Sequence, residues 1–451
     1  MKRLLSLSIA AALSGLVLTS TAFAEDSAGQ RLVEKGQYLA VAGDCAACHT
    51  TDGGKPFAGG LAIATPIGKI ISTNITPSKT DGIGDYSLAD FEKAVRQGIR
   101  KDGARLYPAM PYTSYARITD QDMQALYAYF MQAVAPVDQK TRATDLPFPF
   151  NIRFSMAGWN LLFAGDKPYT EDSSQSAAWN RGAYLVQGLA HCSTCHTPRN
   201  ALMAEKQGQA LAGASLGTWF APNITPDMHA GIGHWSASDL ASYLSAGHSP
   251  TGSQAGGPML EAINKSFSRL SASDINAIVT YIRATTPQPE NAAPGRLPAS
   301  PPRVSELALM NDSASPGAQL YSEHCATCHQ LSGQGSRGLP ALYGNAALQH
   351  PVADNAVMAI LDGLTPDHGQ AMPSFSSSMN DQQISTLVNY IFSTFGDREV
   401  QTSPQRVAVL RAGGAPSPLL SIARGGMIAA VVIVAGLIIA GVVRRSRRKK
   451  R

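Results

Sequence analysis

The chain has 451 residues, a length that suits about three domains, and a formal net charge of +5. Nine of its 37 basic residues lie near the two ends, seven within 444–451 and two at Lys2 and Arg3. The rest of the chain has 28 basic and 32 acidic residues, or about −4 (28 − 32), and this balance excludes a basic nucleic-acid-binding surface.

Residues 1–24 are predicted to be a secretory signal peptide. Lys2 and Arg3 precede an apolar run, and Ala22-Phe23-Ala24 has the A-x-A pattern of a cleavage site. Cleavage there leaves a mature chain that begins near Glu25, outside the cytoplasm.

All six cysteines belong to three copies of the motif C-x-x-C-H. The copies are Cys45, Cys48 and His49; Cys192, Cys195 and His196; and Cys325, Cys328 and His329. A structural zinc site needs four ligands, commonly from two pairs close in sequence, whereas these pairs lie more than a hundred residues apart. A thioredoxin-like dithiol needs a βαβ context and no histidine. Covalent c-type haem explains every copy, because both thiols bond to the haem and the histidine is the proximal ligand of its iron.

Two predicted helices flank each motif, so we expect an all-α protein. The first contains a glycine followed by an aromatic residue and begins near Gly36, Gly182 and Gly317. The second has apolar residues at i, i+3, i+4 and i+7, and a polar residue can cap its first turn. The capping residues are Thr119, Ser271 and Asn380. This repetition predicts three tandem domains of one fold, at residues 25–150, 175–290 and 311–400.

A haem iron that only carries electrons needs a second axial ligand. His49 is the only histidine of the first domain, so methionine is the usual alternative. Met110 lies between prolines in "YPAMPYTSY", whereas Met123 and Met131 belong to the closing helix and are interpreted as core residues. Met110 is therefore the predicted ligand.

The other two domains offer similar candidates with more rivals. In the third domain "QAMPSF" repeats the Ala-Met-Pro sequence around Met110. It predicts Met372 as the ligand, with His350 and His368 as alternatives. In the second domain Met259 lies 63 residues after His196, close to the 61 residues between His49 and Met110. No proline follows it, and three histidines compete with it. These are His229, His234 and His248.

The C-terminal part carries a linker and a membrane anchor. Residues 291–310 are rich in proline and predict a semi-rigid linker before the third domain. Residues 425–443 are nineteen uncharged, mostly apolar residues, which as a helix reach about 28 Å and can cross a ~30 Å hydrocarbon core. The basic tail 444–451 is expected in the cytoplasm, which agrees with an exported body.

From about Gly36 to Phe395 the chain resembles the three-haem cytochrome c subunits of membrane-bound, periplasm-facing dehydrogenases of Gram-negative bacteria. The resemblance rests on the three motifs, on "GIRKDGARLYPAMPY" from Gly98, and on two "NITP…GIG" segments that begin at Asn74 and Asn223. It implies three tandem class I cytochrome c domains, one C-terminal transmembrane helix and three covalent haem c groups.

The resemblance also implies a function and its partners. A separate flavin or pyrroloquinoline quinone subunit would oxidise gluconate, an alcohol, an aldehyde or a sugar, with a small accessory subunit beside it. This chain, not itself an enzyme, would relay the electrons to ubiquinone in the inner membrane, with its haem domains in the periplasm. The six cysteines would hold haem, and the iron ligands would be the three motif histidines with Met110, Met259 and Met372. The alternative is a peroxidase-like haem enzyme with one open haem.

Overall fold

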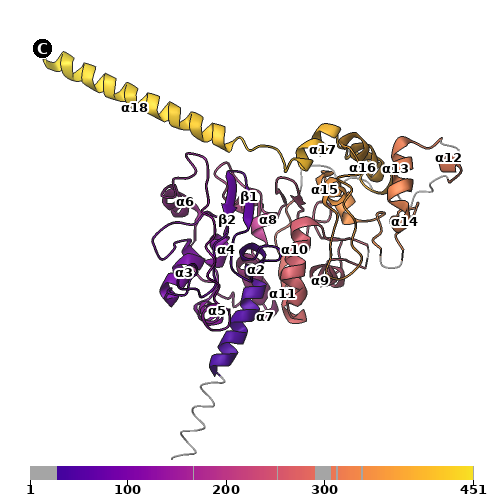
Figure 1. Cartoon of the computed structure of the whole chain (residues 1–451), viewed down its shortest axis with the longest axis horizontal. Helices are drawn as coiled ribbons and strands as arrows, with labels where there is room; N and C mark the ends of the chain where they lie inside the picture. Colours follow the sequence, from indigo (N-terminus) through magenta and orange to yellow (C-terminus); the bar gives the residue numbers. More distant parts are fainter. Residues whose placement is uncertain are drawn as a thin grey trace, which may run out of the picture.

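The computed structural model describes residues 28–165, 167–250, 252–289, 306–310, 313–336 and 339–449, and it is mostly helical (Figure 1). The predicted signal peptide, most of the predicted linker and the last two residues of the basic tail lie outside these ranges. Three units follow one another along the chain, and each has a first helix, a short helix at the C-x-x-C-H motif and a closing helix.

The first unit begins with a helix at 28–42 and ends with the closing helix α5. Between them lie α2 (Cys45–His49), β1 (Ala62–Thr65), β2 (Gly68–Ile71), α3 (Leu88–Gln97) and α4 (Tyr112–Tyr115), and α5 itself is Asp120–Gln132. The two strands form an antiparallel hairpin in which Ala62 pairs with Ile71. A separate helix, α6 (Ser155–Phe163), connects this unit to the next.

The second unit repeats these elements with one addition. Its elements are α7 (Ala177–Tyr184), a π-helical turn (Leu185–Leu189), α8 (Ser193–His196), β3 (Ala214–Ser215), β4 (Phe220–Ala221), α9 (Ala237–Ala246), α10 (Gly257–Lys265) and α11 (Ala272–Ile282). Ten residues run from Gly36 to Cys45, but eleven run from Gly182 to Cys192. The π-helical turn accommodates the extra residue and keeps the motif in the same place.

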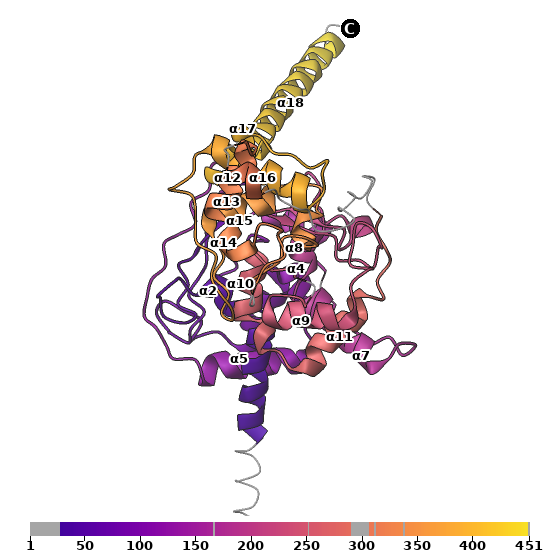
Figure 2. The ribbon, with the colours of Figure 1, turned by 90° about the vertical axis from the view of Figure 1, so that its right-hand side faces the viewer.

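The third unit is shorter and leads into the C-terminal helix. Its elements are α12 (Glu306–Met310), α13 (Pro316–His324), α14 (Ala326–His329), α15 (Asp354–Asp362) and α16 (Asp381–Phe395), followed by α17 (Pro404–Arg411) and α18 (Leu419–Lys449). An ion pair between Arg406 and Asp354 joins α17 to α15. The long helix α18 stands away from the body in both views (Figures 1 and 2). Its side chains are exposed, and it is long and apolar enough to cross a membrane.

A glycine lets the first helix of each unit cross its closing helix. A Cβ at Gly36 would lie 1.9 Å from the Ala125 carbonyl oxygen, and one at Gly182 would lie 2.0 Å from that of Ala277. In the third unit a Cβ at Gly317 would lie 2.5 Å from a side-chain carbon of α16. Because real side chains never approach this closely, only glycine fits where the helices cross.

The predicted caps of the three closing helices are confirmed. The Thr119 hydroxyl accepts a hydrogen bond from the backbone N–H of Asp122, and the Ser271 hydroxyl accepts one from that of Asp274. Of these three closing helices, only the one capped by Asn380 has the full reciprocal capping box, which Asn380 forms with Gln383. In the first two units the carboxylates of Asp122 and Asp274 make other contacts, which are described below.

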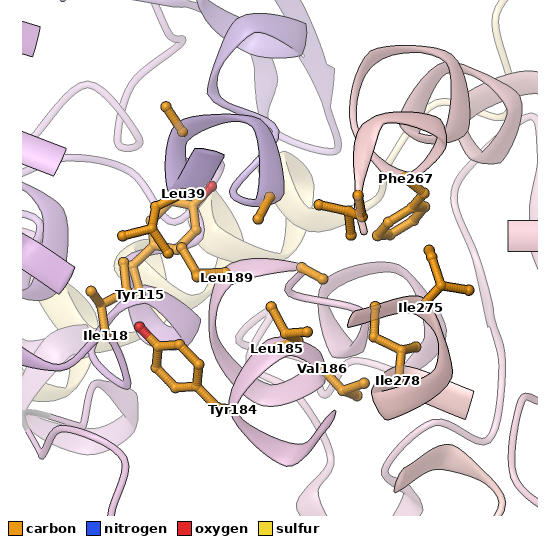
Figure 3. Packing of buried hydrophobic residues seen from close by; sticks show 14 of the residues in the cluster. Leu39, Tyr115, Ile118, Tyr184, Leu185, Val186, Leu189, Phe267, Ile275 and Ile278 are labelled. Carbon is orange, nitrogen blue, oxygen red and sulfur yellow. The ribbon is translucent and has the colours of Figure 1, made fainter. Parts of the chain in front are cut away.

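The first two units share one hydrophobic core. Figure 3 shows Leu39 and Tyr115 of the first unit packed beside Leu189 of the second, which lies on the π-helical turn. A single cluster of buried residues continues from there to Ile278 on α11, whereas the third unit has a core of its own. The first two units are therefore packed as one body, to which the third is attached.

Candidate haem-binding sites

Each motif histidine is held by a backbone carbonyl. Nδ1 of His49 lies 2.7 Å from the Thr73 oxygen, and Nδ1 of His196 lies 2.7 Å from the Pro222 oxygen. In the third unit the distance from Nδ1 of His329 to the Pro340 oxygen is 2.8 Å. A carbonyl can only accept, so Nδ1 carries the hydrogen in all three rings and Nε2 keeps its lone pair for a metal.

Burial keeps these three imidazoles neutral. Burial lowers the pKa of each ring below the ordinary histidine value. The hydrogen bond to the carbonyl acts in the opposite direction, but its effect is smaller. The neutral ring is the form that binds a metal ion. The same tautomer and charge state at three sites is what a proximal haem ligand requires.

The repeated "NITP" segments position two of these carbonyls. Thr73 directly precedes Asn74, and Pro222 directly precedes Asn223. The side-chain oxygen of Asn74 accepts hydrogen bonds from the backbone and hydroxyl of the threonine two residues later, and Asn223 does the same. The amide group of Asn74 also donates a hydrogen bond to the carbonyl of Val137, and this bond ties the turn to the end of the first domain. The sequence showed the repeat, but its part in orienting the histidines was missed.

No disulfide joins the two cysteines of any motif, so all six thiols are available for thioether bonds. Burial raises the pKa of Cys45 to about 12 and that of Cys48 to about 11. It raises the pKa of Cys192 and Cys325 to about 12 in the other units. In the described ranges, no three His, Cys, Asp or Glu side chains gather into a metal-binding cluster, so the zinc alternative finds no ligand set. A thiol pair beside an imidazole with a free Nε2 fits haem c.

Met110 and Met259 occupy equivalent places in their units. Each follows a loop that begins at a glycine with positive φ and is closed by a backbone hydrogen bond to that glycine; Met110 lies in the turn after this bond, and Met259 lies in the first turn of α10. The closing bonds run from Leu106 to Gly98 and from Ala255 to Gly247, both 2.8 Å. Each methionine lies four residues after the donor and packs, half-buried, against the shared core. The structure therefore places Met259 where the spacing predicted it.

The sequence around Met259 differs from that around Met110 because a tryptophan fills the space beside it. Gly257 stands where the first unit has Pro108, and a Cβ at Gly257 would lie 2.3 Å from the ring of Trp219. Trp219 itself packs against the core of the third unit. The altered loop thus makes room for a contact between units.

Four of the five rival histidines are exposed. His229, His234 and His248 are exposed, and so is His368. His350 is half-buried, and its ring contacts Phe220 of the second unit at 6.0 Å between centroids. Desolvation of its ring is the main cause that lowers the pKa of His350 to about 4. Met372 packs half-buried against the core of the third unit and pairs with Leu364 in a backbone bridge.

Comparison with known proteins agrees with these features. A family model described as "Cytochrome c" matches the chain three times, over residues 33–133, 180–286 and 314–395. The chain is 44% identical to the fructose dehydrogenase cytochrome subunit of Gluconobacter japonicus, over 94% of this chain and 93% of the relative. It is 41% identical to the gluconate 2-dehydrogenase cytochrome c subunit of Pantoea cypripedii, over 87% and 92% of the two chains. A cytochrome c subunit of alcohol dehydrogenase (quinone), from Gluconacetobacter polyoxogenes, is 40% identical over 90% of each chain.

The chain belongs to the cytochrome c family, among the cytochrome c subunits of dehydrogenases. The resemblance seen in its motifs is therefore confirmed, and so is the mostly helical fold of three cytochrome c domains and one long apolar helix. As a cytochrome subunit the chain is an electron carrier rather than the dehydrogenase itself.

The motif loops of the first two cytochrome c domains lie side by side. The hydroxyl of Tyr115 donates to the carbonyl of Gly43, two residues before Cys45, at 2.6 Å. The ring of Tyr115 also contacts that of His191, which directly precedes Cys192, with 5.7 Å between centroids. The buried side chain of Tyr115 thus contacts the residues just before both C-x-x-C-H motifs.

Two equivalent tyrosines cross between these cytochrome c domains. The Tyr38 hydroxyl of the first domain donates to Asp274 of the second at 2.7 Å, and the Tyr184 hydroxyl of the second donates to Asp122 of the first at 2.6 Å. Both tyrosines lie two residues after the glycine at the helix crossing, and both aspartates lie at the third position of a closing helix. The contact is therefore reciprocal, as across a two-fold axis.

Each aspartate also has a cation from its own domain. The Lys35 ammonium lies 2.6 Å from Asp122, and the Arg181 guanidinium donates two hydrogen bonds to Asp274, at 2.8 and 2.7 Å. Lys35 and Arg181 directly precede the crossing glycines. Both carboxylates are thus buried with partners on two sides, one of them across the domain interface.

The third cytochrome c domain contacts the second through backbone and amide groups. Asn355 accepts a hydrogen bond from the N–H of Phe220 at 2.7 Å and donates to its carbonyl at 2.8 Å. Asn264 of α10 donates to the carbonyl of Thr365 at 3.1 Å, beside the loop of Met372. The second domain therefore contacts both neighbours, the first near its own C-x-x-C-H motif and the third through β4 and α10.

Proposed function

We propose that this chain is the electron-transfer subunit of a membrane-bound dehydrogenase and relays electrons through three covalently bound haems to ubiquinone. The observation that carries the proposal is the imidazole geometry, repeated in three domains that pack against one another. In each, Nδ1 is bound to a carbonyl and Nε2 remains available to iron.

The proposed assignment of residues follows from the sites. Haem would be held through thioether bonds by Cys45, Cys48, Cys192, Cys195, Cys325 and Cys328, and the iron would be bound by His49 with Met110, His196 with Met259, and His329 with Met372. Haem, when bound, supplies a reversible one-electron iron couple. The protein holds each imidazole in one tautomer through a backbone carbonyl, and it packs the first two domains around one shared core. Contacts such as that of Tyr115 with both motif loops favour transfer between neighbouring domains.

The proposed location is the inner membrane, with the three domains in the periplasm. Residues 1–24 would direct export and be removed, and α18 would cross the bilayer over residues 425–443. The basic residues from Arg444 onward would then lie on the cytoplasmic side. The domain limits 25–150, 175–290 and 311–400 and the linker 291–310 remain part of this proposal.

The proposed partners are a catalytic subunit with flavin or pyrroloquinoline quinone, a small accessory subunit, and ubiquinone. The relatives named above belong to fructose, gluconate and alcohol dehydrogenases, which supports a sugar, a sugar acid or an alcohol as the substrate of that catalytic subunit. Oxidation of these substrates releases two electrons, and three single-electron centres can accept and pass them on one at a time.

Mixing the separated subunits tests the proposal. The isolated chain should oxidise none of these substrates. With its dehydrogenase subunit present, substrate should reduce it, and a ubiquinone analogue should reoxidise it. Turnover of substrate by the isolated chain would contradict the proposal and favour the haem-enzyme alternative.

Haem content is tested by a pyridine haemochrome assay and the mass of the mature chain. We expect three haems and no free thiol. A value of two would refute the assignment of whichever motif carries no haem, and replacement of His49, His196 or His329 in turn would identify it.

A further inference from the structure

One short segment of the body has an unusual density of exposed apolar side chains. In the described part of the chain, six of the nine large apolar residues that are exposed outside α18 lie on or beside the segment 148–162. They are Phe148, Ile152, Phe154, Leu161, Leu162 and Leu202. Leu161 is 87% exposed and Phe154 is 82% exposed. Scattered apolar residues on a surface need no explanation, but a contiguous patch marks an interaction site.

The segment is rigidly attached to the first cytochrome c domain by its other side. Asn160 accepts a hydrogen bond from the Tyr112 hydroxyl at 2.7 Å, and the Arg153 guanidinium lies over the ring of Tyr107 at 4.7 Å. The indole of Trp159 donates to the carbonyl of Leu202 at 2.9 Å, which joins Leu202 to the same surface. Other side chains of the segment already attach it to the body. The apolar side chains are therefore left exposed on its outer side.

The patch lies at the level where α18 leaves the body. The Arg424 side chain, directly before the apolar run that begins at Gly425, donates to the carbonyl of Phe148 at 3.2 Å. Figure 1 shows α6 at the edge of the body toward which α18 extends. An arginine at the end of a membrane-spanning helix marks the membrane surface, since its charge stays among the lipid headgroups. Phe148 is thus placed at that surface.

The composition of the segment fits lipid better than a polar partner. Between Asp145 and Asp166 the only charged residue is Arg153, and its guanidinium is occupied by Tyr107 and by the carbonyl of Arg105. A segment without acidic residues and with exposed Phe and Leu side chains enters the headgroup region of a membrane through its apolar side chains.

We propose that the surface formed by Phe148, Ile152, Phe154, Leu161, Leu162 and Leu202 is a second membrane contact, which inserts into the outer leaflet beside α18. It holds the first cytochrome c domain, with its Tyr107–Tyr112 loop, against the lipid surface. This inference rests on the proposed membrane anchoring by α18. A single helix would leave the body free to rotate, whereas two contacts fix which domain faces the bilayer.

Photo-crosslinking in vesicles tests this contact. The full chain, in complex with its dehydrogenase subunit, is reconstituted in vesicles of phosphatidylethanolamine and phosphatidylglycerol. The photoreactive residue p-benzoylphenylalanine replaces Leu161, Ile433 or Met228 in three separate variants, and the visible spectrum of each checks that it has folded. Ile433 lies within α18 and reports on the anchor, and Met228 is an exposed apolar residue of the second domain that serves as the matched control.

We expect lipid adducts, detected by the mass of the crosslinked peptide, at Leu161 and Ile433 and at least tenfold less at Met228. Lipid at Ile433 without lipid at Leu161 would overturn this inference alone, as would a crosslink from Leu161 to the dehydrogenase subunit. Equal adducts at Leu161 and Met228 would also overturn it. Absence of lipid at Ile433 would overturn the anchoring itself.

Discussion

Removing the hydroxyl of Tyr38 should loosen a helix in a different domain. Tyr38→Phe deletes the 2.7 Å hydrogen bond to Asp274 and the weaker 3.1 Å hydrogen bond from the backbone N–H of Ser271, but it keeps the ring, and Arg181 still holds the carboxylate. A hydrogen bond to a charged group contributes about 1.5–3 kcal/mol, so we take ~2 kcal/mol for this one. Tyr184→Phe makes the equivalent change in the opposite direction and should loosen the start of α5 through Asp122.

Hydrogen exchange of the haem-loaded chain measures this effect. At about 1.4 kcal/mol per factor of ten, ~2 kcal/mol corresponds to roughly thirtyfold faster exchange of amides in the first turns of α11 in Tyr38→Phe. The matched control is Tyr127→Phe, which deletes a 2.8 Å hydrogen bond to the Tyr86 carbonyl within the first domain. It should leave α11 unchanged.

Two results would refute this reasoning. One is unchanged exchange in α11 of the Tyr38→Phe variant, which would mean that the bond contributes nothing to domain docking. The other is an equal effect of Tyr127→Phe, which would mean that any loss of stability in the first domain spreads to the second.

Three further predictions concern the glycine at a helix crossing, the iron ligand Met110 and the loss of stability at low pH. Gly182→Ala should destabilise the second domain by about 1–3 kcal/mol through overpacking, whereas Gly29→Ala, which meets no atom within 4 Å, should not lower the melting temperature. Met110→Ala should let one haem bind carbon monoxide and Met123→Ala should not; three unreactive haems in Met110→Ala would disprove that ligand. Burial alone would raise the pKa of Asp274, but its hydrogen bonds outweigh burial and hold that pKa below the ordinary value. Its stabilising effect is therefore complete above an unfolded pKa of about 4 and is lost as the pH falls through the lower folded value. The melting temperature should drop over that range by less in Asp274→Asn, and an identical drop would contradict the assignment.

The sequence was sufficient for the local features of each domain. Apolar periodicity and capping residues located the closing helices, since both act within a few residues of the chain. Spacing from the motif histidine indicated that Met259 and Met110 are equivalent positions, and both follow a loop with the same closing hydrogen bond, while the role of Met259 as an iron ligand stays a prediction.

Features that join distant segments could not be predicted in this way. Tyr38 lies in an ordinary helical repeat, and nothing within that helix indicates that its hydroxyl reaches Asp274, 236 residues later. The extra residue before Cys192 was countable, but whether it forms a π-helical turn or a longer loop depends on the tertiary packing of Leu185 and Leu189. The sequence shows that no proline follows Met259, but the packing of Trp219 against Gly257 became known only from the structure.

Deleting this chain from the dehydrogenase complex tests the central claim most directly. The measurement is the rate of substrate-dependent ubiquinone reduction in membranes, alongside the rate with an artificial electron-accepting dye that reacts with the catalytic subunit. We predict that quinone reduction is lost without the chain, that dye reduction persists, and that returning the full chain restores the first activity. Unchanged quinone reduction in membranes without the chain would contradict its assignment as the electron relay.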